Sequence, residues 1–311
     1  MTWLIPGLMA IYAVRIVWLA RRAVQGQRLR VIRAGAAKLL LVYLGIAIVL
    51  SFLANWFLYH PSRQMSRWEA QDENKIEEVW LTSEDGTRLH AFWYPLAGAK
   101  WSVIYSHGNA GNLSHREWSV ELWRRVGASV LIYDYPGYGR SDGRPSEAGC
   151  QAAGRAAYGW LRNQKQIPPE EAVLFGESLG CAMAIDLAVT QPHRALVLYA
   201  PFTSIADMAQ SMFPWLPARL LVGTKYDNLG KLRGYHGPLF IAHGTADTIV
   251  PFDQGERLFQ AAPSSVKRLF PVPDLGHNEA LVPPVFSAIR DFLASLPPYA
   301  SDHAATETPP P

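Results

Sequence analysis

Cysteine is scarce in this chain, because Cys150 and Cys181 are the only two among its 311 residues. Two cysteines are too few for a disulfide framework, and Cys181 lies in an apolar run where we expect a buried thiol. The sequence also lacks a metal-ligand spacing, a Walker-type phosphate loop and a dinucleotide-binding fingerprint. We therefore expect no metal and no cofactor.

A large excess of charge of one sign is lacking as well. The 29 lysines and arginines against 26 aspartates and glutamates leave a formal net charge of only +3. The basic residues are concentrated near the N-terminus, and the body of the chain has no Lys/Arg stripe interleaved with aromatic residues. Nucleic acid is therefore not an expected partner.

Charge is entirely absent from one long run near the N-terminus. Residues 39–59 are uncharged and mostly apolar, and roughly twenty such residues suffice to cross a bilayer. This run predicts a transmembrane helix, with Trp56 and Tyr59 suited to the interface at its far end. Residues 3–20 are also apolar but are interrupted by Arg15. They predict either a first span with a snorkelling arginine or an interfacial helix, and we slightly favour the span. No basic region precedes them, which disfavours a cleaved signal peptide.

Acidic residues are missing between these two apolar runs. Residues 21–38 instead hold Arg21, Arg22, Arg28, Arg30, Arg33 and Lys38. The positive-inside bias places such a stretch in the cytoplasm. The second run then leads outward through the inner or plasma membrane, and we expect the rest of the chain on the outer face, which in a bacterium is the periplasm.

The most specific pattern in the chain is Gly-Glu-Ser-Leu-Gly at residues 176–180. It follows a short apolar strand that begins at Ala172 and precedes an apolar helical run that reaches Asp186. The two glycines remove Cβ atoms that would collide with backbone in a tight strand-to-helix turn. The order predicts that Ser178 is a nucleophile whose side chain is accessible to substrate at a helix N-terminus, where developing negative charge is favoured.

The same five-residue pattern occurs once more, at residues 139–143. Ser141 there has no strand directly before it and no apolar helix directly after it, so the segment is typical of a polar turn. The requirement for a strand, a turn and a helix in succession favours Ser178 over Ser141.

A nucleophilic serine needs a histidine base and an acid that holds the histidine in one tautomer. His277 follows the last predicted strand, in a Gly-His-Asn loop, and Asp247 lies in the loop after the strand near residue 238. The chain order Ser, Asp, His separates this set from triad folds that use other orders. We therefore predict Ser178, Asp247 and His277 as the catalytic residues.

Other histidines and aspartates compete for these roles. His107 and His243 each close a strand before a glycine, where we favour a structural role. Asp253 begins a helical run and is typical of an N-cap, and Asp274 is typical of a turn residue. The remaining histidines lie in polar or boundary contexts where we expect solvation: His60, His90, His115, His193, His236 and His303.

Two backbone N–H donors are expected to hold the oxyanion of an acyl-transfer reaction. One is that of Leu179, directly after the nucleophile. The other is expected in the loop after the strand at residues 101–106, where Asn109 is our candidate and Ala110 is an alternative. Beyond this loop, residues 114–117 read as a capping box for the next helix.

These motifs resemble the α/β-hydrolase family over about residues 59–296. The segments that carry the resemblance are residues 59–63, 82–87, 107–112, 134–143, 176–180, 201–204 and 243–247. The chain resembles in particular the branch with His-Gly-Asn-Ala-Gly-Asn after the third strand. That branch includes eukaryotic protein depalmitoylases, and other similar proteins are called esterases or grouped with serine aminopeptidases. The depalmitoylases are held to membranes through an N-terminal cysteine cluster, which this chain lacks.

The order of predicted elements supports the same fold. Strands at about 76–82 and 87–94 form a hairpin through Asp85-Gly86, and further strands near 101, 129, 172, 195, 238 and 267 alternate with helix-length segments. This alternation predicts an α/β fold with a mostly parallel, eight-stranded sheet and helices on both faces.

The chain is expected to have three parts: a membrane anchor at residues 1–59, a hydrolase domain at 60–296 and a disordered tail at 297–311. The longest gap between strands, residues 201–237, is rich in apolar residues and is the natural lid. The alternative is that its apolar stripe packs on the sheet as core.

Together these patterns predict a membrane-anchored serine hydrolase that cleaves a carboxylic ester or thioester through an acyl-enzyme. The tether and the apolar lid favour lipid-like substrates or acylated proteins, with membrane lipid as a partner of the N-terminal helices. Three alternatives stay open. They are an amide-cleaving, aminopeptidase-like enzyme, an acyltransferase on the same triad, and a non-enzymatic interaction module on a hydrolase fold.

Overall fold

The computed structural model describes residues 4–24, 27–66, 76–277, 279 and 282–299, with only the backbone described for residues 52–57. The predicted interfacial side chain of Trp56 and the tail residues 300–311 therefore lie outside the described part. The chain divides into two compact units. The helical unit comprises residues 1–57 and 205–225, and the sheet unit comprises residues 58–204 and 226–311.

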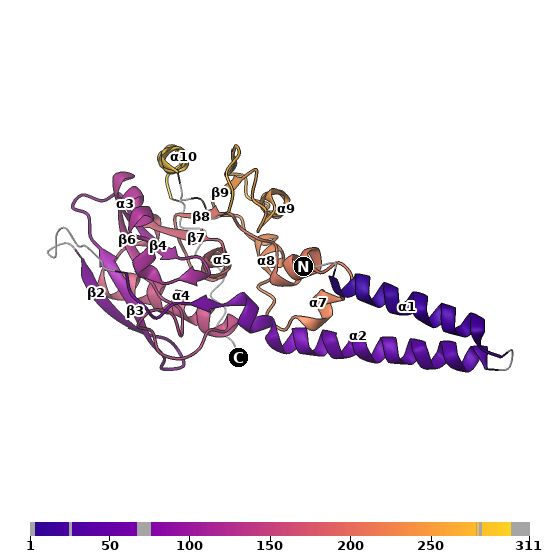
Figure 1. The fold of residues 1–311 in the computed structure, drawn as a ribbon. Coiled ribbons are helices and arrows are strands. Elements are labelled where there is room, and N and C mark those ends of the chain that lie inside the picture. Colours follow the sequence, from indigo (N-terminus) through magenta and orange to yellow (C-terminus); the bar gives the residue numbers. More distant parts are fainter. Residues whose placement is uncertain (1–3, 25–26, 67–75, 278, 280–281, 300–311) are drawn as a thin grey trace, which may run out of the picture. The chain divides into compact units, whose positions relative to one another are not determined.

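An eight-stranded sheet forms the centre of the sheet unit (Figure 1). Its strands are β2 (Glu77–Thr82), β3 (Arg88–Tyr94), β4 (Trp101–Ser106), β6 (Ala128–Tyr133), β7 (Ala172–Glu177), β8 (Ala195–Tyr199), β9 (Leu239–Gly244) and β10 (Lys267–Val272). Their order is β10-β9-β8-β7-β4-β6-β3-β2, and only the pairs β2/β3 and β3/β6 are antiparallel. The predicted α/β fold and mostly parallel sheet are confirmed.

Helices cover both faces of this sheet. They are α3 (Glu117–Arg125), α4 (Glu147–Gln164), α5 (Gly180–Thr190), α8 (Asn228–Leu232), α9 (Phe252–Ala261) and α10 (Pro283–Ser295). Helices α3 and α10 contact each other, and α4, α5 and α8 form a second group in which each contacts the next. Because the central strands are covered from both sides, β4, β6, β7 and β8 are buried along almost their whole length.

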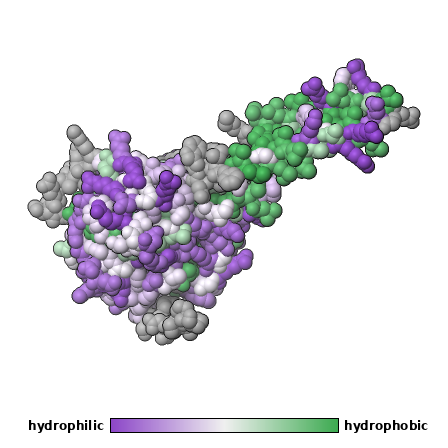
Figure 2. Space-filling model, turned by 90° about the horizontal axis from the view of Figure 1, so that it is seen from below, coloured by the Kyte–Doolittle hydropathy of each residue, from purple (hydrophilic) through white to green (hydrophobic). Residues whose placement is uncertain are grey.

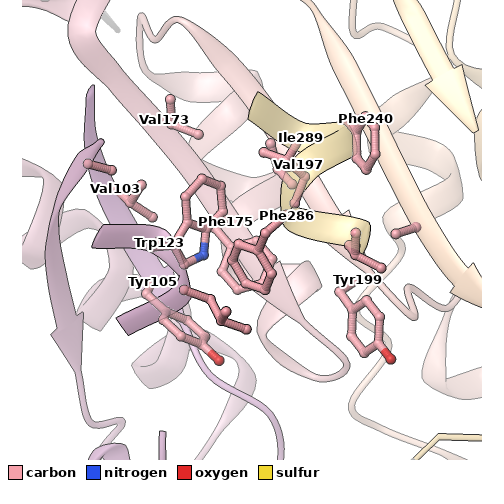
Figure 3. Close-up of a cluster of buried hydrophobic side chains, with 14 of the residues drawn as sticks. Val103, Tyr105, Trp123, Val173, Phe175, Val197, Tyr199, Phe240, Phe286 and Ile289 are labelled. Carbon is pink, nitrogen blue, oxygen red and sulfur yellow. The ribbon is translucent and has the colours of Figure 1, made fainter. Parts of the chain in front are cut away.

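Aromatic side chains fill the layer between the sheet and helices α3 and α10 (Figure 3). The ring of Trp123 on α3 lies 5.1 Å from that of Phe175 on β7 and 5.4 Å from that of Phe286 on α10, both edge to face. Such pairs add to the free energy gained by burying their large apolar surfaces. This layer holds β7 firmly, and β7 is the strand that leads into the Gly-x-Ser-x-Gly turn.

Two helix starts differ from the expectation. Helix α3 begins at Glu117 after Arg116, whose side chain makes no capping hydrogen bond. Ser114 does not cap α3, because it lies inside a short 3₁₀-helix (Leu113–His115) that Asn112 caps by accepting the N–H of Ser114 at Oδ1. Helix α9 begins at Phe252 after Pro251, so Asp253 lies in its first turn and is not its N-cap. The physical reason is that Pro251 has an extended ψ of 143° and is already at the position just before the helix.

The helical unit contains α1 (Leu4–Arg22), α2 (Arg28–Leu58), α6 (Ile205–Met212) and α7 (Ala218–Leu221). Helices α1 and α2 are close at Gly35, where an added Cβ would lie 2.7 Å from the side chain of Ile16. Both are long and apolar enough to cross a membrane, over residues 4–22 and 28–51. Most of their apolar side chains are exposed, and Figure 2 shows this hydrophobic surface in green.

Candidate active site

The turn at residues 176–180 has the backbone geometry that its glycines predict. Strand β7 ends at Glu177, helix α5 begins at Gly180, and Ser178 between them has a left-handed φ of +52°. A Cβ on Gly176 would lie 2.5 Å from the Cα of Cys181, and a Cβ on Gly180 would overlap the carbonyl oxygen of Ser106. Only glycine fits at either position, and the strained turn holds Ser178 at the helix N-terminus.

Ser178, His277 and Asp247 form one hydrogen-bonded row. The Oγ of Ser178 lies 2.9 Å from Nε2 of His277, and Nδ1 of His277 lies 2.7 Å from Oδ2 of Asp247. A carboxylate only accepts, so Nδ1 of His277 carries the proton. In the neutral ring Nε2 is then free of a proton and accepts the hydroxyl of Ser178. The structure therefore brings together all three residues named from the sequence, with hydrogen-bond partners that match the tautomer of a general base.

Asp247 is held ionised by its surroundings. Its Oδ1 accepts the N–H groups of Ile249 (2.9 Å) and Val250 (2.8 Å). Burial raises the pKa of Asp247, but hydrogen bonds from His243, His277 and Val250 outweigh it and hold that pKa well below the ordinary value of 3.8. An ionised Asp247 can stabilise the imidazolium that forms when His277 takes a proton.

His243 lies next to Asp247 of the hydrogen-bonded triad, and the sequence did not predict this proximity. Its Nε2 donates to the carbonyl oxygen of Val250 (2.8 Å) and lies 3.5 Å from Oδ2 of Asp247. We predicted a structural role for His243, and the contact with Val250 agrees with it. The four-residue spacing in His-Gly-Thr-Ala-Asp was the available signal for the contact with Asp247.

Ser141 and Asp274, which competed for catalytic roles, have structural ones. Ser141 is fully buried and its Oγ accepts the N–H of His90 (2.9 Å), while Arg140 and Asp142 on either side of it are exposed in a segment without helix or strand. Asp274 has a left-handed φ of +56° and donates its N–H to Oγ1 of Thr245, as a turn residue does. Cys181 is buried as predicted, and burial raises the pKa of its thiol.

Asn109 and Leu179 remain the predicted oxyanion donors. The side-chain oxygen of Asn109 accepts the backbone N–H of His60 (3.1 Å) and the hydroxyl of Tyr138 (2.9 Å). Its side chain is thus used to hold the loop at residues 107–112, which leaves the backbone N–H as the group for a substrate. Leu179 is the residue just before α5, where N–H groups of the first turn have no partner within the helix.

The segment that follows α2 holds the 107–112 loop from its outer side. Residues 59–66, which we call the linker, contribute β1 (His60–Pro61), and β1 pairs in parallel with β5 (Ala110–Gly111). The N–H of Ser62 then donates to the carbonyl oxygen of Gly111 (3.0 Å). The side-chain amide of Asn112 donates to the carbonyl oxygens of Ser62 (3.0 Å) and Gln64 (2.9 Å).

A buried carboxylate holds the same loop from within the fold. Oδ1 of Asp134 accepts the N–H of Leu113 (2.8 Å) and lies 3.2 Å from Nε2 of His107. Burial raises the pKa of Asp134, but hydrogen bonds from His107, His90 and Leu113 lower it below its ordinary value. The close approach of Gly139, which has φ +50° and where a Cβ would overlap Oδ2, explains the glycine in this part of the sequence.

An ion pair lies directly beside the proposed nucleophile. Oε2 of Glu177 accepts the hydroxyl of Tyr105 and lies 3.4 Å from Nε of Arg116. Nη2 of Arg116 also donates to the carbonyl oxygen of Ala110 (2.9 Å). Burial lowers the pKa of the Arg116 guanidinium, but Glu177 together with Tyr105, Tyr135 and Asp134 raises it above its ordinary value. Arg116 therefore joins β7 to the 107–112 loop, a link that no local motif indicated.

Metal chemistry has no evident donor set here. Among the described residues, no group of three or more histidine, cysteine or carboxylate side chains is placed to hold a metal ion.

Comparisons with known proteins identify the family of this chain. Residues 103–307 match the family model described as the alpha/beta hydrolase family. An uncharacterised protein of Mycobacterium tuberculosis is 40% identical over 221 residues, which cover 70% of this chain and 78% of that protein. Alpha/beta hydrolase domain-containing protein 17B of Xenopus laevis is 29% identical over 244 residues, which cover 78% of this chain and 83% of that protein.

Solved structures show the same fold. The esterase Pf2001 of Pyrococcus furiosus superimposes with a TM-score of 0.63 at 19% identity and covers 76% of this chain and 98% of its own. The esterase RhEst1 of Rhodococcus gives a TM-score of 0.55 at 19% identity, over 71% of this chain and 99% of its own. The match to the family model extends over more than half of the sequence. The chain therefore belongs to the alpha/beta hydrolase family.

Proposed function

We propose that this chain is a membrane-anchored serine hydrolase that cleaves a carboxylic ester or thioester through an acyl-enzyme. The observation that carries the proposal is the row Ser178 Oγ, His277 Nε2 and Nδ1, Asp247 Oδ2, with distances of 2.9 and 2.7 Å. A scaffold without catalytic function has no physical need for a serine in a strained turn aimed at a correctly protonated histidine. The esterase names of the two solved structures point the same way.

The reaction proceeds in two halves on these groups. Oγ of Ser178 attacks the carbonyl carbon and forms a C–O bond, while its proton passes to Nε2 of His277. The imidazolium then gives this proton to the leaving alcohol or thiol as its bond to carbon breaks. In the second half, His277 takes a proton from water, whose oxygen attacks the acyl carbon and releases the acid and Ser178. Asp247 stays ionised throughout and stabilises the imidazolium.

The oxyanion of each tetrahedral intermediate is held by the backbone N–H groups of Asn109 and Leu179. One such donor is worth on the order of a hundredfold in rate, so the position of the 107–112 loop matters for the reaction. The linker, Asp134 and Arg116 all contact this loop and are positioning residues.

Helices α1 and α2 form the proposed membrane anchor. Both are long and apolar enough to cross a bilayer. The basic residues between positions 21 and 38 place that stretch in the cytoplasm by the positive-inside bias, so the sheet unit lies on the outer face. A reporter fused after Ser66 is expected to be active only outside the cytoplasm, and cytoplasmic activity would contradict this orientation.

A covalent probe tests the nucleophile. The purified full-length protein is treated with a fluorophosphonate, and the modified residue is located by mass spectrometry of the peptides. We expect the adduct on Ser178 and none in the Ser178→Ala variant. Ser141→Ala, which changes the second Gly-x-Ser-x-Gly pattern, is the matched control and is expected to keep the adduct. A Ser178→Ala variant that reacts with the fluorophosphonate at the wild-type rate would contradict the proposal.

Substrate class is tested separately. The protein is given p-nitrophenyl esters of increasing chain length, matching thioesters and an aminopeptidase substrate, with and without an added alcohol. We expect hydrolysis of esters and thioesters that increases with acyl length, because the anchor favours lipid-like or acylated substrates. Turnover of the aminopeptidase substrate alone, or acyl transfer to the alcohol in preference to water, would instead assign the site to those chemistries.

A further inference from the structure

The segment at residues 205–225 lies in sequence between two parts of the sheet unit but belongs to the helical unit. It contains α6 and α7, and its ends are joined because the N–H of Ile205 donates to the carbonyl oxygen of Lys225 (2.9 Å). It leaves the sheet unit and returns to it at neighbouring points, and in between it belongs with α1 and α2 to the helical unit. We call it the insertion.

Two hydrogen bonds attach the insertion to α2. The hydroxyl of Tyr43 donates to the carbonyl oxygen of Trp215 (3.2 Å), and the hydroxyl of Ser51 donates to that of Leu221 (3.0 Å). Tyr43 and Ser51 are eight residues apart, which is about 12 Å along a helix. The insertion therefore follows α2 for more than two turns, within the uncharged run at residues 39–59.

These two contacts have the chemistry of a lipid environment. Hydrocarbon offers no hydrogen-bond partner, so a hydroxyl on a spanning helix and a carbonyl in a turn or at a helix C-terminus must each find one in the protein. Each of these bonds satisfies one group of each kind. In water all four groups could bond to solvent instead, and nothing would require the pairing.

The charged residues of the insertion also fit a lipid environment. Three of its residues are charged at neutral pH, namely Asp207, Arg219 and Lys225. Nη2 of Arg219 lies 2.7 Å from Oδ1 of Asp207, and Lys225 lies at the end of the segment. Charged side chains at membrane depth are typically paired in this way.

Apolar side chains of the insertion point away from the protein. Leu220 is 86% exposed and Met212 is 55% exposed. On α2, Leu41 and Ile48 are exposed to a similar degree, at 68% and 55%. The exposed apolar surface thus continues from the proposed spanning helix onto the insertion, as expected if lipid surrounds both segments.

We propose that the insertion is embedded in the lipid bilayer beside α2, and that Leu220 and Met212 contact lipid acyl chains. The inference rests on the membrane anchoring proposed above. It makes residues 205–225, which lie within the lid expected at 201–237, a part of the membrane anchor.

Site-directed fluorescence tests this placement in the full-length protein. A Leu220→Cys variant is labelled with an environment-sensitive nitrobenzoxadiazole probe and reconstituted into phosphatidylcholine vesicles with or without nitroxide-labelled lipid. Both native cysteines are buried, so labelling is selective for the new one. Leu41→Cys on α2 is the control for a lipid-facing position, and Gln260→Cys on α9, which is exposed on the sheet unit, is the control for water.

We expect the label at position 220 to emit at the short wavelength of the label at position 41, and nitroxide lipid to quench it at least ~2-fold more than the label at 260. A label at 220 that behaves like the one at 260, while the one at 41 is quenched, overturns the inference and leaves the anchor intact. If the label at 41 is not quenched either, the anchor fails as well. Fluorophosphonate labelling of the same samples reports on Ser178 independently. Met212→Cys repeats the test should Leu220→Cys fold poorly.

Discussion

The side-chain amide of Asn112 donates a hydrogen bond to the carbonyl oxygen of Ser62 over 3.0 Å. This bond, with that to Gln64, ties the linker after α2 to the end of the 107–112 loop, which carries a proposed oxyanion donor. On its other side, Oδ1 of Asn112 accepts the N–H of Ser114 and caps the following 3₁₀-helix. Asn112 thus joins the linker, the loop and the 3₁₀-helix that follows it.

Asn112→Asp is expected to separate these two functions. The carboxylate can still accept the N–H of Ser114, but it faces the carbonyl oxygens of Ser62 and Gln64 without a donor. We expect kcat to fall about tenfold or more as the loop shifts, since one oxyanion donor is worth ~100-fold. Ester hydrolysis kinetics check this, with the exposed Asn163→Asp as a control for the added charge. An unchanged kcat would show that the linker does not position the loop.

Asp247→Asn is expected to lower kcat by about 10³–10⁴ and leave KM nearly unchanged, because an amide can present its N–H₂ to His277 and favour the wrong tautomer. Steady-state kinetics of the variant measure the effect. The control is Asp253→Asn, an exposed change on α9 that is expected to have wild-type kinetics. A variant at position 247 with more than a tenth of wild-type kcat would contradict the role of Asp247.

The pH dependence of stability is expected to report on Asp247. Its folded-state pKa is lowered below 3.8, so the ionised form stabilises the fold. This contribution is fully present above the unfolded-state pKa and is lost as the pH falls from there through the folded-state pKa. Thermal unfolding of the full-length protein in detergent, from about pH 6 to pH 3, is compared with that of Asp247→Asn. The wild type is expected to lose more stability on acidification, and parallel curves would argue against the shift.

Gly180→Ala is expected to prevent folding or to lower the unfolding temperature strongly, because its Cβ would overlap the backbone carbonyl of Ser106. Gly159→Ala, inside α4, is the matched control. Nothing lies within 4 Å of its added Cβ, so we expect it to gain about 0.5–1 kcal/mol in free energy of unfolding. Thermal unfolding of both variants measures the difference, and equal stability would refute the steric reading of the turn.

Arg116→Met is expected to reduce the free energy of unfolding by about 1.5–3 kcal/mol, the usual value of hydrogen bonds to a charged group. It removes the contacts with Glu177 and Ala110, so kcat is expected to fall as well. Arg125→Met, at the end of α3 with an exposed guanidinium, is the control. A double variant with Glu177→Gln is expected to cost less than the sum of the single changes, and strict additivity would show that the two side chains are not coupled.

Much of the fold could be predicted because its signals are local. Apolar strands that alternate with helix-length segments specify a parallel sheet, and Asp85-Gly86 specifies the hairpin at its edge. Local signals also misled in two places, since Ser114 and Asp253 have the residue types of helix caps. Ser114 instead lies inside a 3₁₀-helix that Asn112 caps, and α3 begins only after Arg116. Pro251 is at the position just before α9, so Asp253 lies in the first turn of that helix.

The sequence by itself determined the strained turn around Ser178. Positions 176 and 180 must be glycine because a Cβ there would collide with atoms of the turn and of a neighbouring strand. The strand–turn–helix order of the sequence already implies both neighbours. It also named Asp247 and His277 through their places after successive strands. Only the tertiary structure decided that the linker pairs with Ala110–Gly111, that His243 lies beside Asp247, and that the insertion follows α2. The linker and the insertion join residues about 50 to 170 positions apart, and no local pattern encodes a contact that depends on how the whole chain closes.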